Sequence, residues 1–207
     1  TTFQFSTKEN QTLRENKVTT LYTRYFDIDL HPETGVAYPL SPIHFEQDTN
    51  GFQIVPVVYI KNKVFQSGET NPADLALKTF DFINQINRKN QISITEIQID
   101  CDWTVTTKKT KIPNVDYGVL MYYNLGEIAP NTKNSIYDSE IAQRYLASLK
   151  NYPLQLNVAV PIFSWAIHIR NGKVIGLRNK INWHDFETDN HFAALNNNWL
   201  EVVSSNY

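Results

Sequence analysis

Two aspartates, one residue apart, end an apolar stretch near the middle of the chain. Asp100 and Asp102 follow Ile97 and Ile99, and on a strand their side chains would project from the same face. A carboxylate that is buried without a partner costs free energy or shifts its pKa. Acids at the end of a buried strand are therefore expected to be solvated, paired, metal-bound or catalytic, the alternative being that they cap a neighbouring turn. The pattern favours a functional site.

A second pair of aspartates repeats this arrangement. Asp27 and Asp29 follow an aromatic and β-branched stretch, and the four acids would form one cluster if the two strands lie close together. Such a cluster could hold a hard divalent cation with His31 or His44. No recognised metal-binding spacing accompanies it, so no metal site is predicted. Arg24 could instead neutralise the cluster by pairing with a carboxylate.

Apolar stretches alternate with segments of helical spacing along the chain. The sequence predicts strands over 21–26, 54–60, 94–100, 119–124 and 154–160, helices over 6–16, 72–87 and 135–150, and a hairpin of 165–170 and 173–177. Asn71 and Ser135 are the expected N-caps of the second and third helices, and Asn171-Gly172 is a strong hairpin turn signal. Strand, helix and strand in alternation are typical of a parallel α/β fold.

The composition restricts the classes of function. The chain has 207 residues, 42% of them hydrophobic, and a net charge of −2, so it can bury a sizeable core and has no basic surplus for a nucleic acid partner. Its apolar runs are too short to predict a transmembrane segment. With only seven glycines and no phosphate-binding loop, no cofactor is expected. Cys101, the single cysteine, cannot form an internal disulfide and is expected to pack in the core.

The spacing of the elements is irregular in one region. Between Asp102 and Val119 there are too few residues for the helix, strand and second helix that the alternation requires. The chain also opens on a helix, 6–16, with no strand before it. We therefore expect an incomplete view of a longer chain, lacking a first strand, a segment near 108–109 and a C-terminal part. The alternative is a compact, partly open α/β sheet.

Two motifs resemble family 18 glycoside hydrolases. Asp100-Cys101-Asp102-Trp103-Thr104 resembles the Asp-x-Asp-x-Glu that ends the fourth strand of that family, and Met121-Tyr122-Tyr123-Asn124 resembles the Met-x-Tyr-Asp or Asn of its sixth strand. The resemblance implies a single (β/α)8 TIM-like barrel over 1–207. A second resemblance, to barrel proteins from Bacteroidetes whose acidic strand reads Gln-Ile-Asp-Cys-Asp-Trp-Thr, covers most of the chain and implies no particular activity.

The family resemblance implies a catalytic set and one departure from it. Asp100, Asp102 and Tyr123 are its expected catalytic residues, with Asp102 orienting the N-acetyl group of the substrate and Tyr123 binding it. Thr104 stands where the family has its proton-donating glutamate. Because threonine cannot protonate a glycosidic oxygen at neutral pH, whether the protein is an enzyme stays open. Cleavage would need another donor, for which Asp27, Asp29 and Asp100 are the candidates.

Polar and aromatic residues near the strand ends complete the expected binding site. The expected substrate-binding residues are Arg24, Asp27, Asp29, Tyr59, Trp103, Met121, Asn124 and Trp165, although aromatic residues among them could equally fill a core. The sequence thus predicts a carbohydrate-active or carbohydrate-binding barrel with a glycan or oligosaccharide partner. A periplasmic or cell-envelope location is expected, with the cytoplasm as the other possibility. The alternative is a non-catalytic structural or interaction subunit of a cell-envelope assembly, docking on an envelope protein through the tail around Asn196 to Trp199.

Overall fold

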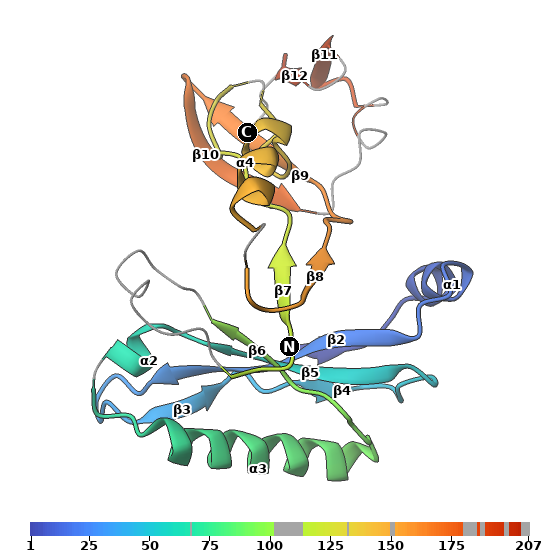
Figure 1. The fold of residues 1–207 in the computed structure, drawn as a ribbon. Helices are drawn as coiled ribbons and strands as arrows, with labels where there is room; N and C mark the ends of the chain where they lie inside the picture. The colour runs from blue at the N-terminus through green and yellow to red at the C-terminus, as the bar shows by residue number, and fades with distance from the viewer. Residues whose placement is uncertain are drawn as a thin grey trace. The chain divides into compact units, whose positions relative to one another are not determined.

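The computed structural model describes residues 1–66, 68–101, 114–131, 133–149, 152–179, 186, 189–196 and 199–203. The chain divides into two compact units, Thr1–Lys111 and Ile112–Tyr207, and each is described by itself. Figure 1 shows the elements of both units.

The first unit is built on a four-stranded sheet in the order β3-β2-β5-β6. Its strands are β2 (Thr20–Leu30), β3 (Ala37–Leu40), β5 (Gln53–Ile60) and β6 (Gln98–Cys101). β2 and β6 both run parallel to β5, whereas β3 is antiparallel to β2. The remaining elements are β1 (Thr2–Phe3), which pairs in parallel with β4 (His44–Phe45), and the helices α1 (Thr7–Glu15), α2 (Lys63–Gln66) and α3 (Pro72–Asn90).

Helix α3 covers one face of this sheet (Figure 1). It begins where the sequence predicts, because the side chain of Asn71 accepts hydrogen bonds from the backbone N–H groups of Ala73 and Asp74 and Pro72 occupies the first turn. It ends at Asn90, and the next residue, Gln91, adopts a left-handed conformation. The buried core between helix and sheet includes Phe26, Ile28, Val58, Ile60, Leu75, Ile83 and Ile86. Cys101 packs against this core, as expected.

Strand β2 carries one extra residue relative to its partner β5. Arg24 is opposite Val57 and Phe26 is opposite Val58, so Tyr25 is the additional residue of a β-bulge. Tyr25 and Phe26 both face α3: the Tyr25 hydroxyl donates to Asn87 Oδ1 at 2.7 Å, and the Phe26 ring contacts Phe82. The backbone carbonyl of Tyr25 accepts from the N–H of Ile43 at 2.6 Å, so the bulge does not leave it without a partner.

The second unit consists of strand pairs and one helix. The strands are β7 (Gly118–Met121), parallel to β8 (Leu156–Ala159), β9 (Trp165–Arg170), antiparallel to β10 (Lys173–Asn179), and β11 (Phe192–Asn196), antiparallel to β12 (Trp199–Val202); the helix is α4 (Ser139–Leu149). Asn171 and Gly172 both have positive φ, 50° and 71°, which confirms the hairpin predicted from them.

The predicted (β/α)8 TIM-like barrel is wrong. In the described part of the chain, parallel pairing joins β2 to β5 and β6, β7 to β8 and β1 to β4, and no closed barrel forms. The structure is instead β-rich with small mixed sheets. Residues 37–45 form short strands where a barrel would place a helix after β2, and 165–179 form an antiparallel hairpin. A strand-helix-strand unit such as β5-α3-β6 is shared by open sheets and barrels alike, so the alternation did not specify closure.

Two smaller expectations are corrected as well. Ser135 does not cap α4, which begins at Ser139 after Asp138, whose carboxylate accepts from the N–H groups of Glu140 and Ile141. The short strand β1 precedes α1, so the chain does not open directly on a helix. The predicted gap near 108–109 lies outside the described residues. None of the helices in the described ranges is both long and apolar enough to cross a membrane.

Candidate functional site

Two of the predicted acids and one aromatic residue lie in a row across the sheet of the first unit. Asp27 of β2 is opposite Tyr59 of β5, and Tyr59 is opposite Asp100 of β6. Residues paired across a sheet project from the same face. Because Ile28 and Val58 face α3, alternation directs Asp27, Tyr59 and Asp100 to the opposite face. We call these three residues, together with Arg24, the sheet-face site.

Arg24 joins the row because of the bulge. Arg24 and Asp27 are three residues apart, a spacing that puts side chains on opposite faces of a regular strand, but the bulge takes up Tyr25, so both project from the same face. The Arg24 guanidinium donates from Nε to Asp27 Oδ1 at 2.6 Å and from Nη2 to Asp27 Oδ2 at 2.8 Å. It also lies 4.8 Å from the centre of the Tyr59 ring, a cation–π contact. Arg24 thus pairs with one acid, Asp27, which was the alternative to a role in substrate binding, and that role stays a prediction.

The electrostatics of the sheet-face site favour a charged Arg24. The hydrogen bond to Asp27 raises the pKa of Arg24 above its ordinary value, against the opposing effect of burial, and the charges of Asp27 and Asp100 add to this rise. The pair is partly open to solvent, with 49% of the Arg24 side chain and 21% of the Asp27 side chain exposed. The result is a fixed array of donors and acceptors that solvent can reach.

Asp29 has a different environment from the acids of the sheet-face site. Its residue is 8% exposed, and its Oδ2 accepts from Lys61 Nζ at 2.6 Å while its Oδ1 lies 2.6 Å from Lys63 Nζ. Oδ1 also accepts from the N–H of Leu30. The hydrogen bonds from Lys61 and Lys63 lower the pKa of Asp29 to about 2. We call Asp29, Lys61 and Lys63 the lysine clamp.

The two lysines of the clamp were missed by sequence reasoning. The available signal was that both lysines follow β5 and lie two residues apart. The sequence around them does not indicate that they share a partner, Asp29, which lies more than thirty positions earlier in the chain. Tyr38 of β3 is opposite Asp29 in the sheet and was missed too. His31 lies in contact with the Tyr38 ring, with centroids 5.4 Å apart, and His44 is on β4.

The other predicted site residues divide into two groups. Asp102 and Trp103, like Thr104, lie outside the described residues. Met121, Tyr123, Asn124 and Trp165 belong to the second unit. Among the predicted site residues, the structure brings together Arg24, Asp27, Tyr59 and Asp100, with Asp29 next to them on β2. Tyr123 belongs to the other unit and is described separately.

In the second unit, Tyr123 is at one end of a row of three aromatic side chains that contact one another in turn. Its ring meets Phe163 edge-on at 5.8 Å, and Phe163 lies 5.4 Å from Trp165. The Trp165 indole donates from Nε1 to the buried Ser135 Oγ at 3.0 Å, which fixes the ring. Sequence reasoning missed this contact of Ser135. Asn124, the residue after Tyr123, has a left-handed backbone conformation with a φ of 54°.

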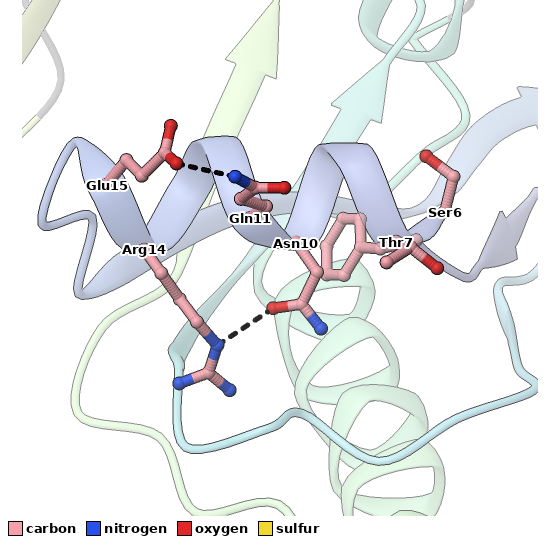
Figure 2. Close-up of a pocket in the computed structure, with 7 residues that line it drawn as sticks. Ser6, Thr7, Asn10, Gln11, Arg14 and Glu15 are labelled. Atoms are coloured by element: carbon pink, nitrogen blue, oxygen red, sulfur yellow. Dashed lines mark hydrogen bonds between the residues drawn. The ribbon is translucent and has the colours of Figure 1, made fainter.

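A shallow pocket along α1 contains none of the predicted site residues. Figure 2 shows its polar side chains engaged with one another along the helix, Arg14 with Asn10 and Glu15 with Gln11. These are i,i+4 pairs that support the helix itself. Among the described residues, no three His, Cys, Asp or Glu side chains are grouped so as to hold a metal ion.

No protein-family model matches this chain, and no curated protein and no solved structure matches it either. The resemblance to family 18 glycoside hydrolases, and that to the Bacteroidetes barrel proteins, therefore stay predictions from the motifs alone.

Proposed function

We propose that the protein binds a carbohydrate on the sheet-face site. The observation that carries the proposal is the row Asp27–Tyr59–Asp100, in which a ring lies between two carboxylates and Arg24 contacts both the ring and Asp27.

The chemistry of these groups suits a polyhydroxylated ligand. Each sugar hydroxyl can donate to a carboxylate and accept from a guanidinium, and the C–H faces of a sugar ring pack on aromatic side chains. The two hydrogen bonds between Arg24 and Asp27 hold these groups before a ligand arrives, which lowers the entropy lost on binding. The motif resemblance at Asp100 points to the same class of ligand, and a glycan ligand would fit a periplasmic or cell-envelope protein.

The proposal is for binding, with cleavage as a separate question. Thr104 cannot donate a proton at neutral pH, and both oxygens of Asp27 accept from Arg24, which favours the ionised form of Asp27. Among these acids, cleavage would therefore require Asp100 to act as the proton donor while a second carboxylate stays ionised. Fold likeness alone would not establish such an activity. An assay for hydrolysis of aryl glycosides by the full chain and by Asp100→Asn tests this part separately.

Binding is tested by titrating the full chain with chitooligosaccharides, peptidoglycan fragments and plant oligosaccharides in a calorimeter. For a ligand that binds, Asp100→Asn should lower affinity at least tenfold, because a hydrogen bond to a charged group contributes about 1.5–3 kcal/mol. Asp81→Asn is the matched control, since Asp81 is exposed on α3, which covers the other face of the sheet. Absence of binding across these glycan classes, or equal affinity of the two variants, would contradict the proposal.

A second candidate is an interaction subunit of a cell-envelope assembly. It is favoured by exposed apolar side chains of the second unit, among them Val160, Ile162 and Leu195. Two residues of the tail expected to dock on a partner, Asn196 at the end of β11 and Trp199 at the start of β12, are opposite each other in antiparallel strands. Light scattering of the purified chain separates the candidates: a monomer that binds glycan supports the first, and an assembly without glycan binding supports the second.

A further inference from the structure

The lysine clamp presents two cations at fixed positions beside the sheet-face site. One buried carboxylate, that of Asp29, holds both ammonium groups, one on each of its oxygens. With both oxygens engaged and the N–H of Leu30 on one of them, Asp29 is a positioning residue for the lysines and not a group that reaches a ligand itself.

The clamp carries a net positive charge that faces solvent. One carboxylate and two ammonium groups leave a charge of +1, and 38% of the Lys61 side chain and 53% of the Lys63 side chain are exposed. Each ammonium has three N–H donors, so its contact with Asp29 leaves donors for a second acceptor. The hydrogen bond to Asp29 also raises the pKa of Lys61 above its ordinary value.

The clamp adjoins the sheet-face site along β2. Asp29 follows Asp27 by two residues, so both side chains project from one face, about 7 Å apart along the strand. The charge of Asp27 also raises the pKa of Lys61. Asp100 lies across Tyr59 from Asp27, and Asp29 lies one step further along β2, so the clamp, the Arg24–Asp27 ion pair and the carboxylate of Asp100 share this face. A ligand spanning this face would meet cations at one end and an acceptor for hydroxyl groups at the other.

We propose that Lys61 and Lys63, held by Asp29, form a subsite for the anionic group of an acidic carbohydrate, so that the ligand of the sheet-face site is a sugar acid or a sulfated sugar. This inference rests on the proposed function. The two clamp lysines pair with the anion, while Asp100 and the Arg24–Asp27 pair hold hydroxyl groups of the neighbouring sugar.

The test compares two ligands that differ only in charge. The full chain is titrated with trigalacturonic acid and with its fully methyl-esterified form, at low and at high salt, and a sulfated galactan oligosaccharide distinguishes sulfate from carboxylate as the anionic group. We expect one of the two acids to bind at least tenfold more tightly than the neutral ester at low salt, with the difference shrinking as salt screens the charges. If neither trigalacturonic acid nor the sulfated galactan binds more tightly than the neutral ester at low salt, the inference is overturned.

Variants assign the charge preference to the clamp. Lys63→Gln should reduce the ratio of acid to ester affinity towards one. Lys78→Gln, on α3 and paired with Asp74, is the matched control and should leave the ratio as it is. Thermal melting shows that each variant is folded, and Lys63→Arg, which keeps the charge, should retain the preference.

The inference is overturned if Lys63→Gln leaves the ratio of acid to ester affinity unchanged. It is also overturned if no glycan binds to the protein. Binding of the neutral ester that depends on Asp100, without charge preference, refutes the inference alone and leaves the proposed function standing.

Discussion

The carboxylate of Asp29 couples the charge state of the clamp to the stability of the first unit. Its pKa is lowered to about 2 by hydrogen bonds from Lys61 and Lys63, whereas an aspartate in an unfolded chain has a pKa of about 3.9. A depressed folded-state pKa means that the stabilisation is fully present above the unfolded value and is lost as the pH falls through the folded one.

We expect the free energy of unfolding to fall between about pH 4 and pH 2 by about 1–2 kcal/mol from this residue, allowing for solvent screening of the exposed lysines. Asp29→Asn should remove this contribution and flatten the pH dependence in that range. Urea denaturation at several pH values measures it, with Asp81→Asn, a change on the exposed side of α3, as the control. Parallel pH profiles for the wild type and Asp29→Asn would show that the clamp does not act in this way.

At the residue scale, local sequence patterns indicated which acids lie near each other, but they did not indicate all of the basic side chains that pair with those acids. Asp27 and Asp100 could be placed near each other because each follows an apolar strand, and the nearby Arg24 was expected as a partner. The lysines of the clamp were not expected, because their partner Asp29 is brought to them only by the pairing of β2 with β5. The roles predicted for Asp102 and Trp103 stay predictions.

At the scale of elements, β2 and α3 are joined by one buried polar contact. The Tyr25 hydroxyl is fully buried and donates to Asn87, a residue only 5% exposed. Burial raises the pKa of Tyr25, so the hydroxyl remains a donor over the whole range of ordinary pH.

Removing this hydroxyl should cost stability without changing the fold. We expect Tyr25→Phe to lower the free energy of unfolding by about 1–3 kcal/mol, because the Asn87 side chain would remain buried without its donor. Tyr152→Phe, at an exposed tyrosine, is the control and should change stability by less than about 0.5 kcal/mol. Chemical denaturation of both variants checks this, and similar values for the two would mean that the contact contributes little.

Elements with strong local signals were predicted well, and elements defined by their partners were not. Helix α3 has its N-cap and an apolar face, and the hairpin of β9 and β10 has its Asn-Gly turn. β3 gave no such signal, since it is four residues long and contains Pro39, which suits its position beside only β2 among the described strands. Ser135 resembled a cap because its type favours that position, but its hydroxyl serves Trp165 instead.

At the scale of the whole molecule, the buried core is distributed unevenly. Of the buried hydrophobic side chains in the described ranges, Ala142 is the one that belongs to the second unit, and the others lie in the first. Because burial of apolar surface is the main source of stability, the first unit should resist opening more strongly.

Hydrogen exchange should reveal this difference directly. We expect backbone amides of β2, β5 and α3 to exchange slowest, and those of β7 and β8 to exchange faster by at least tenfold, since each factor of ten corresponds to about 1.4 kcal/mol of opening free energy. Mass spectrometry of peptides covering Gln53–Ile60 and Leu156–Ala159 compares the two. Equal protection in the two peptides would contradict the expectation.

The overall architecture was the part that sequence patterns could not specify. Alternation of strands and helices predicted parallel neighbours, and β2, β5 and β6 do run parallel. Closure into a barrel depends on every strand having two neighbours, and in the described part β3 and β6 stand at the two ends of the sheet. No local feature of the residues specifies how many neighbouring strands each strand will have.

The bulge in β2 also determines where this strand can change in length. The residues before and after Tyr25 keep the same faces whether or not it is present, because Arg24 and Phe26 are opposite consecutive residues of β5. Loss of Tyr25 would cost its buried ring and leave the N–H of Ile43 without its acceptor, but would leave Arg24, Asp27 and Asp29 on their present side. Loss of Ile28 would instead turn part of the strand over and exchange core for ligand-facing side chains. Natural insertions and deletions in this strand should therefore fall at Tyr25, and a protein that lacks it could still keep the charged row intact.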